Sequence, residues 1–593
     1  MPLSQIDFIN YPSPKESKTT RKRERAGGNP VLSGLLLAIL SRVLAASTFV
    51  QKLLWRLNGF DKIKDLPELE GYTARFDPTV IPATADSSEA LSLLELPRPP
   101  KRRSEKAYYT TADYHEAYKS GALTPVDVAE YLLPLIVRQG KMPNKYSVAY
   151  LDVQPDVVRA AARASAERYR SGKPLSVLDG VPVAVKDEVN LEGHKKSLGS
   201  SLDFRPKLDA TDWCVRKWEE AGAVVIGKTN MHELGLDTTN NNPTWGTPLN
   251  PHNEDYYTGG SSGGSACTAA QGICPVVLGV DGGGSIRIPS SFCGLYGLKT
   301  SQNRVSVYPA VPGANTVAVY GPMAPSIDDL ALAYRIMAQP CPEDPLNKAW
   351  PSPTTHSVVQ VTGEGKRYLG IDREWIDRSD PAVLNMFYAA VQYYRQAHGY
   401  EVVDIRIPLQ AENQKAFSLT ILTEAMTVLS MDKVKQLQHP NQILLNVSGI
   451  HATAQDLLAS NRLRERAMRH LAWLWKQYPG LLVLTPTTPF AGWKIRKPSD
   501  ITDGHGASDA DMTLRSMEYT SFSNWSGTPA ITCPVGYAEG NVPVGIMALG
   551  EWGSEEQLIQ FGQRHESFLG EDGVRRPTKA ENWVDVLSQA TKQ

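Results

Sequence analysis

The sequence predicts an α/β fold in which helices pack against a mixed, mostly parallel β-sheet. Two observations carry this prediction. From about residue 106 onward, helical and strand patterns alternate, and short apolar runs with the composition of buried strands lie between the helices. The chain has 593 residues, of which 41% are hydrophobic and 21% charged, so it can bury a large core.

The overall composition narrows the function classes. The formal net charge is -1, so no global basic field indicates a nucleic-acid partner. The cysteines form no CxxC pair and are sparse, which argues against a disulfide scaffold or a zinc ribbon. We expect reduced, packed thiols in an intracellular protein. The six cysteines are Cys214, Cys267, Cys274, Cys293, Cys341 and Cys533.

The first 105 residues are predicted to form an N-terminal arm, and residues 106–593 the main domain. The arm ends in a Pro-rich basic linker, Pro97 to Lys106 (PRPPKRRSEK). Residues 31–57 are strongly apolar, but basic and serine residues interrupt them, so no uncharged run reaches the roughly 18 to 20 residues of a membrane-spanning helix.

We therefore expect an amphipathic helix over residues 31–57, with Arg42, Lys52 and Arg56 on its polar side. Such a helix could dock on the body of the protein, form a homodimer contact, or lie in a membrane interface. The expected location is accordingly cytoplasmic or peripheral on a membrane.

Within the main domain, each predicted element has a local signal. Thr124 followed by Pro125 and Asp127 is typical of a capped helix start. The expected helices and strands are the following. Helices are predicted at Pro155–Arg170, Asp212–Glu220, Pro381–His398 and Ala454–Gln477, and strands at Val181–Lys186 and Ala223–Ile226.

The second half of the chain divides in two. Residues 307–480 are less regular and are the expected place for substrate-specific walls. From residue 482 onward, LVLTPTTPF is expected to hold a buried strand that ends in a Pro-rich turn, and NWSGTPAITCPVG and NVPVGIMALG are expected to be strands that close the sheet.

One motif is a false match. Gly222 to Thr229 (GAVVIGKT) fits the phosphate-loop pattern GxxxxGK[ST]. Its interior, Ala223 to Ile226, has the composition of a strand rather than of a loop of exposed amides. We therefore interpret it as a strand and not as a nucleotide site.

Two glycine-walled serine clusters, Gly259 to Ser265 and Gly282 to Ser285, flank an apolar run. Gly260 to Gly264 matches GxSxG, the nucleophile elbow of α/β-hydrolases, with Ser262 at its centre. That interpretation requires a downstream acid and histidine, and it leaves the second cluster unexplained. Histidines that fit by order alone include His398, His439, His451, His470, His505 and His565.

Another interpretation uses both clusters together with Lys186. Lys186 ends an apolar strand, where desolvation lowers the pKa of a lysine and leaves a neutral base. One serine could pass a proton to this lysine while a second serine attacks an acyl carbon. The run Gly282 to Gly284 before Ser285 could supply N–H donors to an oxyanion.

The segments VAVKDEVN, GKTNMHELG, TGGSSGGSA and VDGGGSIRIPSSFCGLYGLKT closely resemble the amidase signature family. The separations agree as well, with 75 residues from Lys186 to Ser261 and 24 from Ser261 to Ser285. The resembling core covers about residues 178–305. The resemblance implies an amidase-signature fold, a large mixed β-sheet covered by helices on both faces, and a hydrolase acting on amides without a metal or cofactor.

The resemblance also implies a Ser-Ser-Lys triad, in which Lys186 is the base, Ser261 the bridging serine and Ser285 the acyl-forming nucleophile. The bridging serine would follow a cis peptide bond, Gly260–Ser261. The oxyanion hole would be formed by Gly282, Gly283 and Gly284 with the N–H of Ser285.

Further positions match supporting residues of the family. Ser262, Asp281 and Arg287 would support the site structurally, and Met231 would line the leaving-group side through its backbone. His232 is not needed by the family's mechanism. Val280 stands where a threonine is usual, which is a mild departure.

Within the family, SVLDGVPVAVKDEVN, MHELGLDTTNNNPTWGTPLNP and DGGGS are most similar to plant-type fatty acid amide hydrolases. This implies cleavage of N-acylethanolamines and related lipid amides. Small-amide or aryl-acylamide hydrolases and glutaminase-type amidotransferase subunits would share the catalytic residues, and a non-catalytic member is a remoter alternative.

Overall fold

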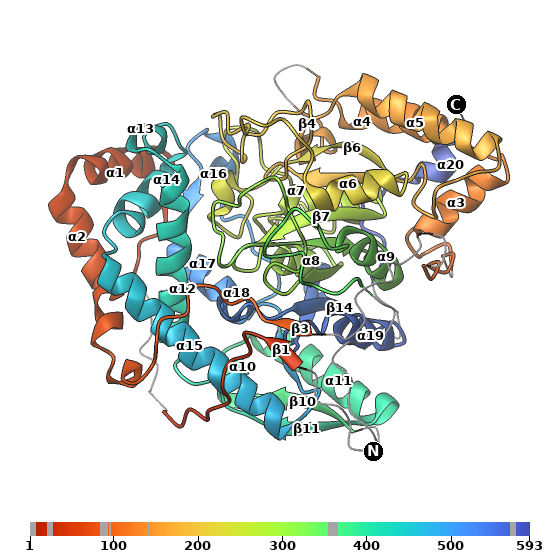
Figure 1. The fold of residues 1–593 in the computed structure, drawn as a ribbon. Helices are drawn as coiled ribbons and strands as arrows, with labels where there is room; N and C mark the ends of the chain where they lie inside the picture. The colour runs from red at the N-terminus through yellow and green to blue at the C-terminus, as the bar shows by residue number, and fades with distance from the viewer. Residues whose placement is uncertain are drawn as a thin grey trace.

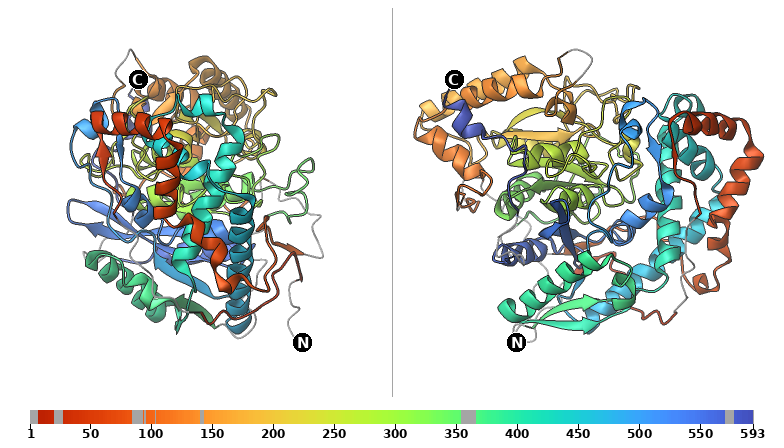
Figure 2. Two further views of the ribbon diagram at one scale, coloured as in Figure 1. Left: turned by 90° about the vertical axis from the view of Figure 1, so that its left-hand side faces the viewer. Right: turned by 180° about the vertical axis from the view of Figure 1, so that it is seen from behind.

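The structure is a computed structural model that describes residues 7–19, 28–83, 93, 96–102, 104–139, 143–353, 366–569 and 577–592. Its centre is an eleven-stranded sheet with helices packed on both faces (Figures 1 and 2). The α/β fold class and the large mixed sheet expected from the sequence are confirmed.

The strands of this sheet do not follow chain order. From one edge to the other they are β11 (Tyr400–Asp404), β10 (Arg367–Ile371), β12 (Leu482–Pro486), β15 (Val542–Leu549), β14 (Ala530–Ala538), β8 (Tyr296–Lys299), β9 (Val319–Ala324), β7 (Val276–Asp281), β5 (Pro182–Lys186), β6 (Val224–Thr229) and β4 (Tyr150–Asp152).

Two expectations about the sheet are wrong. Among the described strands of this sheet, four neighbouring pairs are parallel and six antiparallel, so the sheet is not mostly parallel. In addition, β14 and β15 do not close the sheet. They lie in its middle, because β12, β10 and β11 extend it beyond β15.

Two small sheets involve the N-terminal arm, one within the arm and one that ties it to a later part of the chain. β1 (Asp7–Ile9) pairs with β3 (Ile81–Ala83), and β2 (Leu32–Ser33) pairs with β13 (Ala507–Ser508). The boundary expected between residues 105 and 106 stays a prediction.

The helices of the first half are α1 (Gly34–Ala46), α2 (Thr48–Leu57), α3 (Thr111–Lys119), α4 (Pro125–Ile136), α5 (Pro155–Arg170), α6 (Trp213–Glu220), α7 (Gly263–Ala270), α8 (Arg287–Phe292) and α9 (Ile327–Met337). Those of the second half are α10 (Arg373–Ile376), α11 (Pro381–His398), α12 (Gln410–Ala425), α13 (Met431–Val434), α14 (His439–Leu444), α15 (Ala454–Gln477), α16 (Ser499–Thr502), α17 (Ala510–Ser516), α18 (Ser521–Ser526), α19 (Glu555–His565) and α20 (Val586–Ala590).

The predicted helices of the main domain are confirmed nearly to the residue. α4 begins with a capping box, in which Thr124 Oγ1 accepts from the amide of Asp127 and the Asp127 carboxylate accepts from the amide of Thr124. The phosphate-loop match also folds as expected, since β6 runs through it as a buried strand. All six cysteines are free and buried.

The expectation of one amphipathic helix over residues 31–57 is wrong, because the segment forms two helices. Ser47 ends α1 and caps α2, its Oγ accepting from the amide of Val50 at 3.4 Å. Among the described residues no single helix is long and apolar enough to cross a membrane. α1 and α2 together meet that length and composition, but they are bent by 106°.

The α1–α2 pair lies on the outside of the molecule, over the helices of the second half. In Figure 1 it is at the left, beside α12 and α14, and Figure 2 shows the same arrangement from two other sides. Ser41 Oγ of α1 donates to Gln442 Oε1 of α14 at 2.8 Å. The α1–α2 pair therefore covers α12 and α14 from the outside.

Candidate active site

The candidate base stands where two parallel strands end. Lys186 is the last residue of β5, and Asp281 is the last residue of its parallel neighbour β7. Because the carboxyl ends of parallel strands meet at one edge, the loops that follow both strands converge there. The apolar residues of β5 thus place a lysine at this edge with only 1% of its surface exposed.

The Lys186 side chain is held by three oxygens. Its Nζ lies 2.8 Å from Ser261 Oγ, 3.1 Å from the carbonyl of Val280 and 3.2 Å from Glu188 Oε2. Burial disfavours the ammonium form and lowers the pKa of Lys186 from its ordinary value, although Glu188 acts in the opposite direction. The predicted contact between Lys186 and Ser261 is present.

The first glycine–serine cluster leads into α7. The Gly260–Ser261 peptide bond is cis, as the family resemblance implies. Small residues are required in this helix, because a Cβ on Gly264 would overlap the backbone of Asn230 and Ala149. Ser261 is 1% exposed, and its hydroxyl faces Lys186.

Ser262 has a different environment from that of Ser261. Its hydroxyl donates to the carbonyl of Val280 at 3.2 Å, and its own amide donates to the carbonyl of Ser285 at 3.2 Å. Ser262 is fully buried. It therefore joins the two clusters, and its position argues against a nucleophile elbow.

The second cluster is anchored by a buried ion pair. Arg287 donates from Nε and Nη2 to the two oxygens of Asp281, both at 3.0 Å, and both side chains are fully buried. Burial alone would raise the pKa of Asp281, but the Arg287 guanidinium, together with Lys299 and the amide of Ile286, more than offsets this effect and holds the pKa well below its usual range. Asp281 also accepts from the amides of Gly284 and Ile286, at 2.7 and 3.0 Å.

Because of these bonds, the three glycines expected to form an oxyanion hole differ in their surroundings. The amide of Gly284 is directed at Asp281 rather than at open space. Gly282 and Gly283 line cavities beside Ser285, which is 7% exposed. The carbonyl of Gly283 is fixed by Thr520 Oγ1 at 2.7 Å.

Two neighbouring residues lie apart from the cavity walls. Met231 is fully buried, its carbonyl accepts from Asn242 Nδ2 at 2.9 Å, and it is not among the residues that line either cavity beside Ser285. The ring of His232 is buried, and desolvation lowers its pKa. Its amide donates to the carbonyl of Ser261 at 3.1 Å, so it supports the loop through the backbone.

Several contributing residues were missed by the sequence analysis. Glu188 stands two residues after Lys186 in the same motif, yet nothing local indicates that it faces the lysine. Thr520, Ser523 and Asn524 hold the guanidinium of Arg287 from more than 200 residues away. A polar cluster just before the segment GTPAITCPVG was the only available signal for them.

Ser285 lies where two cavities meet. The inner cavity, of about 180 Å³, also touches Lys186, Glu188, Ser261 and Gly282. The apolar cavity, of about 420 Å³, runs from Ser285 and Gly283 towards the surface. Its wall is built largely from apolar side chains of the N-terminal arm, α12 and the α14 region, including Leu32, Leu40, Val43, Leu44, Val50, Leu54, Phe417, Ile421, Leu422, Pro440, Ile443, Leu444 and Val447.

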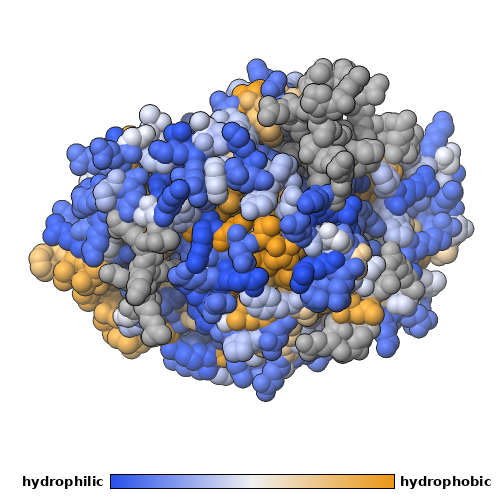
Figure 3. All heavy atoms as spheres, turned by 90° about the horizontal axis from the view of Figure 1, so that it is seen from below, coloured by the Kyte–Doolittle hydropathy of each residue, from blue (hydrophilic) through white to orange (hydrophobic). Residues whose placement is uncertain are grey.

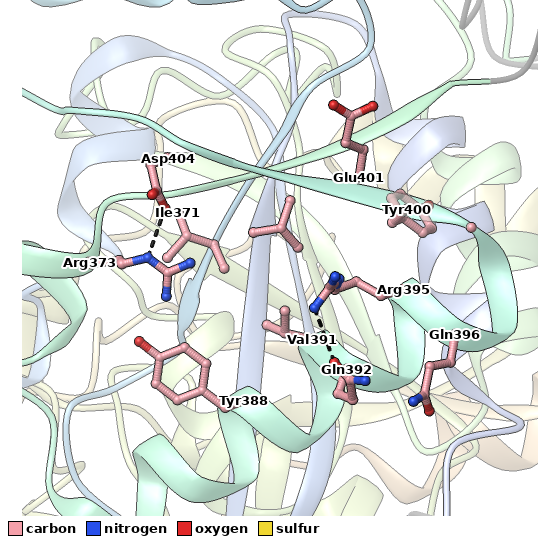
Figure 4. Close-up of a pocket in the computed structure, with 12 residues that line it drawn as sticks. Ile371, Arg373, Tyr388, Val391, Gln392, Arg395, Gln396, Tyr400, Glu401 and Asp404 are labelled. Carbon is pink, nitrogen blue, oxygen red and sulfur yellow. Dashed lines mark hydrogen bonds and ion pairs between the residues drawn. The ribbon is translucent and has the colours of Figure 1, made fainter.

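A larger groove lies elsewhere, at the edge of the sheet between α11 and β11 (Figure 4). Its volume is about 780 Å³, and its charged side chains are engaged locally: Arg373 with Asp404 at 2.8 Å and Arg395 with Gln392 at 3.3 Å. None of the predicted site residues lines it. Size alone therefore does not identify the active site.

Comparison with known proteins identifies the class. The amidase family model matches residues 133–559. The chain belongs to this family, and it is an amide-hydrolysing enzyme of the amidase signature type.

Particular relatives refine this result. The fatty acid amide hydrolase of Medicago truncatula is 34% identical over 493 residues, covering 81% of this chain and 79% of that one. One subunit of the glutamyl-tRNA(Gln) amidotransferase of Chloroflexus aggregans (strain MD-66 / DSM 9485) is 29% identical, covering 80% and 99%. The peptide amidase PAM, solved in complex with the competitive inhibitor chymostatin, superimposes with a TM-score of 0.65 at 25% identity, covering 79% and 98%.

Proposed function

We propose that this enzyme hydrolyses fatty acid amides, N-acylethanolamines among them, through an acyl-enzyme intermediate formed on Ser285. The observation that carries the proposal is the 2.8 Å contact between the buried Lys186 Nζ and Ser261 Oγ, beside a Ser285 that opens into an apolar cavity. The similarity to plant fatty acid amide hydrolases supports the substrate class.

In the proposed mechanism, neutral Lys186 accepts the proton of the Ser261 hydroxyl, and Ser261 accepts the proton of Ser285. The Ser285 oxygen attacks the amide carbon, and the N–H groups of Gly282, Gly283 and Ser285 stabilise the oxyanion. The proton returns through Ser261 to the leaving amine. Water then cleaves the acyl ester by the same proton path.

The walls of the apolar cavity favour a lipid over a small amide. Long acyl chains gain roughly 0.8 kcal/mol for each CH₂ that leaves water, and here the chain would lie among leucine, isoleucine and valine side chains. A small amide would leave most of this surface uncovered. The glutaminase function of an amidotransferase subunit would use the same triad on a polar substrate.

A fluorophosphonate probe and a panel of amides test the proposal together. We expect labelling of the wild type and of Ser262→Ala, and none of Ser285→Ala. On N-acylethanolamines of increasing chain length, kcat/KM should rise steeply. Labelling that survives Ser285→Ala but disappears in Ser262→Ala would contradict the assignment of the nucleophile, whereas faster hydrolysis of glutamine or acetamide would contradict the lipid substrate.

We further propose that α1 and α2 rest on a membrane and pass lipid amides into the apolar cavity. Their outer side chains are unusually exposed for apolar residues: Phe49 is 78% exposed, Leu57 73% and Leu35 67%. Figure 3 shows apolar side chains gathered at its left-hand edge, on the side where Figure 1 places these helices. The inner side chains of the same helices line the cavity that ends at Ser285.

Basic side chains support the same placement of α1 and α2 on a membrane, since Arg42, Lys52 and Arg56 are exposed on these helices. Basic residues near an anionic membrane surface contribute roughly 1 kcal/mol each to binding. The combination of apolar and basic exposed side chains is typical of interfacial helices.

Vesicle sedimentation tests the membrane proposal. Replacing Leu35, Phe49 and Leu57 with Gln should reduce binding to anionic vesicles without changing turnover of a water-soluble amide. The matched control replaces Val157, Leu208 and Leu346, which are 51%, 62% and 51% exposed on other surfaces. Absence of vesicle binding by the wild type would overturn the proposal, and a halved mass of the triple variant in solution would assign the face to a homodimer.

A further inference from the structure

Glu188 lies next to the candidate base and has no part in the mechanism proposed above. Lys186 ends β5, and the chain then turns back on itself, with the amide of Val189 donating to the carbonyl of Lys186 at 2.9 Å. The turn returns Glu188 to the lysine, so that Oε2 lies 3.2 Å from Nζ. Asp187, between them, points the other way and pairs with Lys228 at 3.3 Å.

The bonding capacity of Lys186 gives Glu188 a specific place. A neutral amine has two hydrogens and one lone pair. If the lone pair accepts the Ser261 hydroxyl hydrogen, the two remaining hydrogens match the two other oxygens within reach, the Val280 carbonyl and Glu188 Oε2. Glu188 thus completes the set that turns the lone pair towards Ser261.

We propose that Glu188 is a positioning residue for Lys186: its carboxylate orients the neutral amine towards Ser261 and stabilises the ammonium that forms when the proton arrives. This inference rests on the proposed function of the triad. During the step one proton moves from Ser261 Oγ to Nζ, so the pair of Lys186 and Glu188 changes from a net charge of -1 to zero.

The electrostatics around the pair agree with this role. Burial is the largest influence on Lys186 and lowers its pKa, whereas Glu188 is the strongest of the groups that raise it. The carboxylate therefore stabilises the buried ammonium form of Lys186 that arises during turnover. The other titratable groups that interact with this pair are Asp187, Asp281, His232, Lys196 and Tyr320.

The accessibility of Glu188 separates it from a purely structural ion pair. Its side chain is 22% exposed and lines the inner cavity with Lys186 and Ser285, whereas Lys186 is 1% exposed. A carboxylate at the cavity wall can be replaced without emptying the core, so Glu188→Gln keeps the shape and removes only the charge.

The test is the pH dependence of fluorophosphonate labelling and of kcat/KM in Glu188→Gln, with Glu192→Gln as control. Glu192 is an exposed residue four positions along the same loop. An opposite charge this close raises a lysine pKa by roughly 1 to 3 units. The acidic limb of the pH profile of kcat/KM should therefore move to lower pH by that amount in Glu188→Gln. The plateau rate should fall roughly 10- to 100-fold, as expected for the loss of one hydrogen bond to a charged group.

Glu188→Asp retains the charge but retracts it, so its limb should lie between those of the wild type and Glu188→Gln, and it carries the test if Glu188→Gln does not fold. A limb that stays in place or moves to higher pH in a folded variant overturns the inference. The two proposals fail differently. If the wild type is neither labelled nor active on any amide, the function is wrong; if it is active and the limb does not move, only the role of Glu188 is wrong.

Discussion

The inner and outer walls of the substrate cavity are built on opposite principles. Lys186 and Ser261 on the inner wall, and Asp281 and Arg287 behind it, are at most 1% exposed and are fixed by hydrogen bonds and ion pairs. On the outer wall, α1 and α2 contribute apolar side chains on both sides, and those on the outer side remain exposed. Proton transfer requires fixed distances between the reacting atoms. Entry of an apolar substrate instead requires apolar side chains that no other part of the protein covers.

Removal of the base from the inner wall should have the largest effect. Lys186→Ala should lower kcat/KM roughly 10²- to 10⁴-fold, the usual contribution of a general base. The loss should be greatest near neutral pH. In the wild type the rate should rise with pH through the lowered pKa of Lys186, because only the neutral amine accepts a proton. Lys195→Ala, at an exposed position, is the control, and an unchanged rate in Lys186→Ala would remove lysine as the base.

A buried ion pair, Asp281 with Arg287, lies beneath the nucleophile. Asp281→Asn leaves the buried Arg287 without its counter-charge and should lower the free energy of unfolding by about 3 to 5 kcal/mol, measured by urea denaturation. Breaking the exposed pair of Asp203 and Arg205 should leave it nearly unchanged. Equal effects of the two changes would contradict the special role of the inner wall.

The same pair gives a pH dependence with a definite sign. The folded-state pKa of Asp281 is depressed, so its stabilisation is fully present above the unfolded value of about 3.9 and is lost as pH falls through the folded value. In Asp281→Asn the free energy of unfolding should lack this part of its dependence on acidic pH. The same pH dependence in Asp281→Asn and the wild type would contradict this contribution of Asp281.

A change at the junction of the walls should separate substrates by length. Ile421 lines both cavities, and Ile421→Trp should lower kcat/KM for long-chain amides roughly 10- to 100-fold by blocking the chain. Short-chain amides should be affected much less, and Ile421→Leu serves as the volume-conserving control. A uniform loss across chain lengths would indicate damage to the inner wall instead.

The smallest effect is expected at the bend of the outer wall. Ser47→Ala removes the cap of α2 and should destabilise that helix by about 0.5 to 1 kcal/mol. Hydrogen exchange should become faster in α2 and remain unchanged in α7, while Ser47→Thr should preserve protection. Faster exchange in both helices would show that the two walls are coupled.

The sequence by itself determined the features that depend on neighbouring residues. Short contiguous segments carry the caps and periodicity of α4, α5, α11 and α15 and the strand character of β5 and β6. Lys186 and each of the two glycine–serine clusters also stand in short segments of their own. Ser47 was a readable cap between two apolar runs, so the bend between α1 and α2 was also within reach.

Only the tertiary structure decided which distant groups meet. The order of the sheet places β14 and β15 in its middle, and folding brings Ser261 to Lys186 and Asn524 to Arg287. The reason is physical: backbone preferences act over a few residues, but a hydrogen bond between groups in different elements depends on how all the layers pack. The sequence thus indicated the residues proposed to react, and the packing set their burial, their partners and the surface that leads to them.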